Sequence, residues 1–214
     1  MSVRHDTSTE LQETAPRPGS EAGLLARIKG MMLAPRAEWA RIERESTPSP
    51  RLYVTFVLPL AIVAALIAFV RIGDGVIRAP LGASLITASV VLVFGLLGIL
   101  IVALVIDALA SSFGGVRDRR RAAATAVYAS TPIWIATVFV PFPSVWPALY
   151  VLAVAWHTYL LYLGLRVMMR ASRDRVLGYA TTVVLCSILL EIVFSMVSVA
   201  LGGATHMNPF SAFG

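Results

Sequence analysis

The sequence predicts an all-α membrane protein: a polytopic bundle of five transmembrane helices, preceded by an amphipathic cytoplasmic helical segment. Hydrophobic residues make up 57% of the 214 residues and charged residues only 14%, whereas soluble domains carry about 25% charged residues. The apolar residues form long uninterrupted runs, which favours helices over the alternating strands of a membrane β-barrel. The single cysteine, Cys186, excludes a disulfide scaffold.

The chain divides into four regions by composition. Residues 1–19 are polar and contain proline, which predicts a flexible cytoplasmic tail. Residues 20–50 combine helical periodicity with many charges, which predicts amphipathic interfacial helices. Residues 51–202 hold the long apolar runs and form the predicted transmembrane domain, and residues 203–214 form a short non-cytoplasmic tail.

The amphipathic segment contains two predicted helices separated at Pro35. In the first helix, Ile28 and Met31 belong to an apolar face with helical spacing, and in the second helix Trp39 provides an aromatic side chain among charged neighbours. Two arrangements fit this pattern. The segment lies in the membrane interface with Trp39, Ile28 and Met31 as anchors, or it packs on the cytoplasmic face of the protein itself.

The transmembrane domain is predicted to contain five helices because about 20 apolar residues cross the hydrocarbon core. One stretch of 44 residues, 122–165, lacks Asp, Glu, Lys and Arg, which is too long for a single helix. Its prolines at 141, 143 and 147 predict a turn there. The five predicted spans are 52–70, 79–106, 122–140, 145–168 and 176–202.

The orientation follows from the basic residues. With five spans, 16 of the 18 Lys and Arg residues fall on the side of the N-terminus, and only Arg71 and Arg78 fall on the other side. Cytoplasmic loops carry the excess of basic residues, so the N-terminus is predicted to be cytoplasmic and the C-terminus periplasmic. Lys29 is the single lysine among these residues, a bias typical of a GC-rich bacterial genome. We therefore expect the inner membrane of a bacterium.

No motif in the sequence predicts an enzyme. The sequence lacks a Walker A loop, a GxGxxG fingerprint, an HExxH motif and a GxSxG elbow, and its three histidines are scattered. We therefore expect no catalytic residue, no metal and no cofactor. The net charge of +6 borders the apolar runs, which indicates a membrane surface rather than a nucleic acid as the partner.

Three ionisable residues lie inside predicted spans: Asp107, His157 and Glu191. Each costs at least a few kcal/mol in the membrane unless it is paired or solvated. Asp107 lies near the cytoplasmic end of its helix, where water or Arg166 could satisfy it. These residues act either as structural contacts or as a proton or ion site.

Helical depth and phase predict that His157 and Glu191 face each other near the bilayer midplane. The alternative is that serines, backbone carbonyls or water satisfy each of them separately. Pro132 lies inside the third predicted span. It is expected to kink that helix and to free a backbone carbonyl group.

Three short segments resemble the bacterial members of the Yip family, membrane proteins named for interacting with Ypt/Rab GTPases. They are Met-Leu-Ala-Pro-Arg-Ala-Glu-Trp-Ala-Arg-Ile-Glu-Arg-Glu at 32–45, Tyr-Ala-Ser-Thr-Pro at 128–132, and Tyr-Leu-Leu-Tyr-Leu-Gly-Leu at 159–165. The resemblance covers roughly residues 24–182 and implies a five-helix domain with a cytoplasmic amino-terminal region. The DLYGP-type motif of eukaryotic members is absent, and a bacterial host offers no Rab. We therefore do not expect a Rab-type GTPase as partner.

Two functions fit these observations. The first is a non-enzymatic membrane scaffold or protein-interaction module that affects membrane organisation, with the lipid bilayer, other proteins or a second copy of the chain as partners. The alternative is a small transporter or channel that uses Asp107, His157 and Glu191. A cavity joining the polar residues would favour transport, and a solid bundle would favour the scaffold.

Overall fold

The computed structural model describes residues 21–45, 49–70 and 81–201, and the regular structure in these ranges is entirely helical. The two predicted tails, 1–19 and 203–214, lie outside the described residues. The helices are α2 (Glu21–Leu33), α3 (Pro35–Arg44), α4 (Ser49–Leu52), the π-helical η1 (Tyr53–Val57), α5 (Leu58–Val70), α6 (Leu81–Leu109), the 3₁₀-helical η2 (Ser111–Phe113), α7 (Arg119–Ala129), α8 (Thr131–Thr137), α9 (Trp146–Val167) and α10 (Val176–Ala200).

Four helical segments in the described part of the chain are long and apolar enough to cross a membrane. They are the segment Pro50–Val70, which includes α5, and the helices α6, α9 and α10. The third predicted span, 122–140, is not a single helix but the two shorter helices α7 and α8. The structure therefore supports a multi-pass α-helical membrane protein, and the predicted count of five spans is not confirmed.

The interruption between α7 and α8 occurs at Ser130, directly before the first turn of α8, which contains Pro132. Proline lacks a backbone N–H and is tolerated best in the first turn of a helix. The N–H of Ile133 would normally donate to the carbonyl of Ala129, but it donates to the carbonyl of Ser130 instead, at 3.1 Å. Pro132 thus marks a break between two helices, and the break leaves the Ala129 carbonyl without its helical donor.

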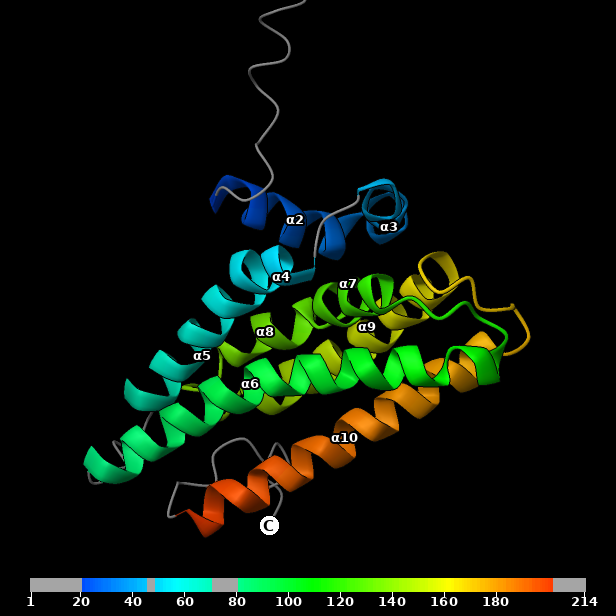
Figure 1. Cartoon of the computed structure of the whole chain (residues 1–214). Coiled ribbons are helices and arrows are strands. Elements are labelled where there is room, and N and C mark those ends of the chain that lie inside the picture. The colour runs from blue at the N-terminus through cyan, green and yellow to red at the C-terminus, as the bar shows by residue number, and fades with distance from the viewer. Residues whose placement is uncertain (1–20, 46–48, 71–80, 202–214) are drawn as a thin grey trace, which may run out of the picture.

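The pair α7–α8 lies between α6 and α9 (Figure 1). Seven residues of α7 are buried, and most of them are small: Ala122, Ala123, Thr125, Ala126, Val127, Tyr128 and Ala129. Small residues allow neighbouring helices to approach closely. By contrast, α5, α6, α9 and α10 expose many large apolar side chains, as expected of helices that face lipid.

The amphipathic segment packs on the bundle. The helices α2 and α3 lie across the end formed by α4, α7 and the end of α9 (Figure 1). Trp39 is 0% exposed and makes an edge-on contact with Tyr128, with ring centroids 6.4 Å apart. Met31 is also fully buried, and Ile28 packs against the same core. These three residues attach the segment to the protein itself, which is the second of the two arrangements expected from the sequence, and their role as lipid anchors stays a prediction.

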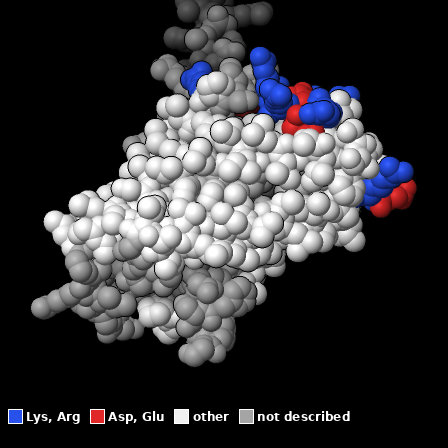
Figure 2. Space-filling model, turned by 60° about the horizontal axis from the view of Figure 1, so that its bottom comes forward, with Lys and Arg blue, Asp and Glu red and all other residues white. Residues whose placement is uncertain are grey.

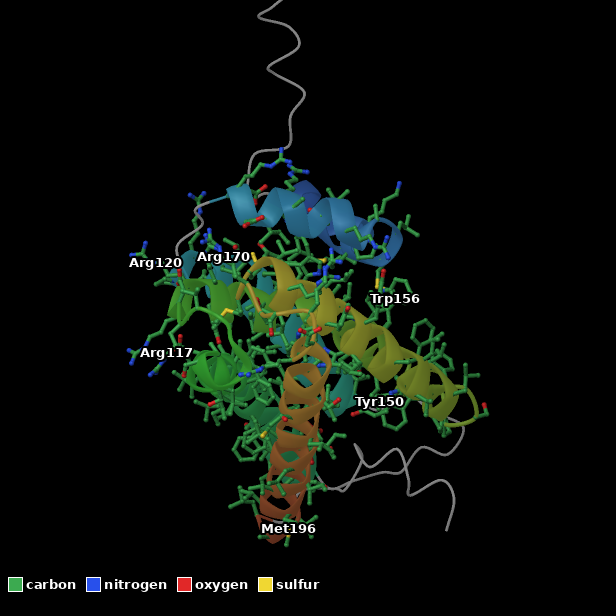
Figure 3. All side chains as sticks on the ribbon, turned by 90° about the vertical axis from the view of Figure 1, so that its right-hand side faces the viewer. Arg117, Arg120, Tyr150, Trp156, Arg170 and Met196 are labelled. Atoms are coloured by element: carbon green, nitrogen blue, oxygen red, sulfur yellow. The ribbon has the colours of Figure 1, made fainter. Side chains whose placement is uncertain are left out.

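The charged side chains gather at this same end of the molecule. Figure 2 shows Lys, Arg, Asp and Glu together at one end, while the rest of the described surface in that view is without them. Arg117, Arg120 and Arg170 lie at this end and Met196 of α10 lies far from them (Figure 3). A charged end beside an apolar body is the surface that a membrane-embedded bundle requires.

Candidate functional site

A cavity of about 270 Å³ lies among α5, α6, α8, α9 and α10. Most of its lining is aliphatic or aromatic, and Lys and Arg are absent from the lining formed by the described residues. Its polar side chains include those of Ser130, Tyr150, His157, Ser187 and Glu191. An apolar cavity with a few convergent polar groups is the usual form of a small-molecule site.

His157 joins α9 to the break between α7 and α8. Its ring is buried, and Nδ1 lies 2.8 Å from the carbonyl oxygen of Ala129. A carbonyl oxygen can only accept a hydrogen bond, so Nδ1 carries the proton and donates. This bond satisfies the carbonyl that the break near Pro132 leaves without a helical donor. The other ring nitrogen, Nε2, takes no part in this bond.

Glu191 lines the same cavity as His157, but Nδ1 of His157 forms its hydrogen bond with the carbonyl oxygen of Ala129. Glu191 is exposed rather than packed, and it shares the cavity lining with Tyr150 of α9. Their direct pairing stays a prediction. A double-mutant cycle of His157→Ala and Glu191→Ala tests it, because residues in contact show coupling of about 0.5–3 kcal/mol and strict additivity would contradict the pair.

Asp107 and Arg166 are not part of this cavity. Asp107 is 5% exposed, and its Oδ2 lies 3.4 Å from Nη2 of Arg117 and 4.0 Å from Nε of Arg119. The guanidinium of Arg166 lies instead over the ring of Tyr162, 5.7 Å from its centroid. Asp107 is thus contacted by Arg117, before α7, and by Arg119, the first residue of α7. Its satisfaction by Arg166 was one of two possibilities expected from the sequence and stays a prediction.

Sequence reasoning missed Tyr150 and Ser130 as members of the site. Tyr150 precedes His157 by seven residues, which is two helical turns, so the spacing alone places both on one face of α9. Figure 3 shows Tyr150 extending from α9 toward α10. Ser130 lines the cavity because α7 ends there. Pro132, two residues further on, was the sequence feature that could have indicated this break.

The fold and the site define a multi-pass α-helical membrane protein with a cavity between its helices. The family model described as Yip1 domain matches residues 29–203, so the chain belongs to the Yip1 family. This finding confirms the resemblance drawn from the short segments of the sequence. Comparisons with curated proteins and with solved structures found no match.

Replacing His157 with leucine should destabilise the bundle by about 1–3 kcal/mol, the cost of leaving a buried polar group unsatisfied. Leucine fills the space but cannot donate to the Ala129 carbonyl. The measurement is the unfolding of the full-length chain in detergent micelles, followed by circular dichroism.

Thr158→Val is the matched control, because the Thr158 hydroxyl donates only to the carbonyl of Val154 within α9, at 2.8 Å. Its loss leaves that carbonyl with its helical partner. Equal destabilisation by both variants would show that the bond to Ala129 contributes nothing of its own.

Proposed function

We propose that this chain is a non-enzymatic membrane scaffold or protein-interaction module that affects membrane organisation. The observation that carries the proposal is the docked segment α2–α3, here called the platform (residues 21–45), which presents charged side chains at the end of an apolar bundle. A rigid charged surface held at the membrane suits binding of another protein better than it suits catalysis.

Buried contacts hold the platform in place. Arg27 of α2 pairs with Glu38 of α3, Nη1 to Oε1 at 2.5 Å, and with Glu45 at the end of α3. Its guanidinium also lies over the ring of Tyr128 in α7, 5.4 Å from the centroid. One side chain thus links both platform helices to the bundle, and Trp39 provides the apolar part of the same attachment.

The orientation belongs to this proposal. The charged end would face the cytoplasm of a bacterium, because 16 of the 18 basic residues fall on that side of the predicted spans. The lipid bilayer surrounds the bundle, and the platform would meet protein partners or a second copy of the chain. Reporter fusions after Arg121 and after Gly214 test this topology, and a cytoplasmic signal from the second fusion would contradict it.

A small transporter or channel is the second candidate, and the cavity is the observation that favours it. His157 and Glu191 line the cavity. Asp107, the third residue that the alternative needs, is paired with Arg117 and is not among the lining residues. Because the three ionisable groups do not line one space, the scaffold remains the better supported function.

Site-specific photocrosslinking in native membranes tests the scaffold. A photoreactive amino acid at Ala37, which is exposed on α3, should give discrete protein adducts. The same amino acid at Leu152, exposed on the apolar surface of α9, should give lipid adducts. Adding Trp39→Ala should abolish the Ala37 adducts, because it detaches the platform without altering position 37. Absence of adducts at Ala37, or adducts unaffected by Trp39→Ala, would contradict the proposal.

A further inference from the structure

We propose that the cavity among α5, α6, α8, α9 and α10 binds a small lipophilic amine, whose nitrogen sits at the carboxyl group of Glu191. This inference is independent of the scaffold function, because it concerns the cavity between the membrane helices and not the platform. Four properties of the cavity define the class of ligand: its volume, its apolar lining, the single carboxyl group among the described lining residues, and its aromatic rings.

The volume and the lining restrict the ligand to a compact and largely apolar molecule. The cavity has a volume of about 270 Å³. An apolar cavity of about 150 Å³ holds benzene, whereas pockets for drug-sized ligands measure about 300–1,000 Å³. A single aromatic ring with a short alkyl amine falls between these limits. Helices α5 and α6 contribute mainly alanine, valine and isoleucine to the lining.

The charge of the lining selects an amine over an acid. Glu191 contributes a carboxyl group, and in the described chain no lysine or arginine lines the cavity to pair with it. An acidic ligand would face this carboxyl group without a compensating cation, which is costly at membrane depth. A basic nitrogen supplies the missing partner. His157 does not replace it, since Nδ1 is committed to the Ala129 carbonyl.

Aromatic rings share the lining of the cavity with Glu191. Phe194 follows Glu191 by three residues on α10, lines the cavity and stacks on Phe94 with ring centroids 4.2 Å apart. Tyr150 and Trp146 of α9 also line the cavity, and their ring centroids are 5.2 Å apart. The faces of such rings attract ammonium groups. A carboxyl group among aromatic rings therefore matches an organic ammonium ion.

Binding requires one proton transfer, and the charges balance. The amine crosses the lipid as its neutral free base and meets the protonated carboxyl group of Glu191. The carboxyl O–H bond breaks, a new N–H bond forms, and the product is an ammonium–carboxylate pair. The net charge inside the membrane does not change, so the pair avoids the cost of an isolated charge.

The test uses the full-length protein in lipid nanodiscs, with 2-phenylethylamine and its neutral analogue 2-phenylethanol as probes. Binding is followed by tryptophan fluorescence, since Trp134 and Trp146 line the cavity. The wild-type chain should bind the amine at least about tenfold more tightly than the alcohol, equivalent to about 1.4 kcal/mol. Glu191→Gln should remove this preference. No preference in the wild type, or an unchanged preference in Glu191→Gln, overturns the proposal.

Two further variants separate the cavity from general effects of lipid and stability. Met196→Gln places the same amide on the exposed side of α10, outside the cavity, and should leave amine binding unchanged. Ser187→Leu keeps Glu191 but fills the cavity one turn away and should abolish binding of both probes. If Glu191→Gln does not fold, Ser187→Leu decides the question, because amine binding that survives it lies outside the cavity and overturns the proposal.

Discussion

Replacing Trp39 with alanine should lower the free energy of unfolding by about 3–5 kcal/mol, the range found when a buried Trp or Phe is truncated. The indole is 0% exposed and fills the space left by the absent side chain of Gly164. Its N–H has no acceptor among the described residues, so the loss arises from packing alone. Detergent unfolding measures the stability, and hydrogen exchange of the α3 amides should show that the platform detaches.

Phe142→Ala is the control, because Phe142 is 57% exposed in the turn before α9; a surface change of this kind should stay within about 0.5 kcal/mol.

Gly164→Ala provides a second check. Its new Cβ would lie 2.7 Å from Cζ2 of Trp39, so the substitution should destabilise the wild type but cost less in the Trp39→Ala background. Additive costs would show that Trp39 and Gly164 do not share one packing site.

Replacing Arg27 with methionine should also destabilise the protein, by about 3–5 kcal/mol, because removing one partner of a buried pair leaves uncompensated charge. The Arg27 and Glu38 side chains are each only 12% exposed. Methionine keeps much of the contact with the Tyr128 ring but leaves the carboxylates of Glu38 and Glu45 close together without their cation. Chemical unfolding of the full-length chain gives the loss of stability.

Arg41→Met is the matched control on the same platform. Arg41 contacts Glu45 at 3.1 Å, but its side chain is 61% exposed, and exposed ion pairs contribute about 0–1 kcal/mol. Combining Arg27→Met with Glu38→Gln and Glu45→Gln should restore part of the stability by removing the unpaired carboxylates. A larger effect from Arg41→Met than from Arg27→Met would contradict the role assigned to the buried cluster.

The long helices could be predicted from the sequence because a long apolar run with at most one charged residue has one stable form in lipid. The runs 79–106 and 176–202 correspond to α6 and α10 within a few residues at each end. The run 122–140 predicted one helix where the structure has two. Hydropathy does not distinguish a continuous helix from a broken one, since both satisfy the same composition, and Pro132 indicated only a kink.

The position of the cavity residues could also be predicted in part. Depth and phase follow from spacing along a helix, which is why His157 and Glu191 were expected in one place and line the same cavity. The partner of His157 could not be predicted, because the Ala129 carbonyl belongs to the backbone and no side-chain pattern records it. The contacts of Asp107 depend on the path of the loop carrying Arg117, which helical spacing does not specify.

The enclosed position of α7 sets an order of events during synthesis. The ribosome releases α7–α8 when α6 is already complete, but α9 has not yet been made. The Ala129 carbonyl can therefore receive its donor from His157 only after the chain has grown well past the break. A segment rich in alanine with three arginines at its start has little apolar surface to hold it in lipid alone. We therefore expect α7 to take its place in the bundle only together with α9.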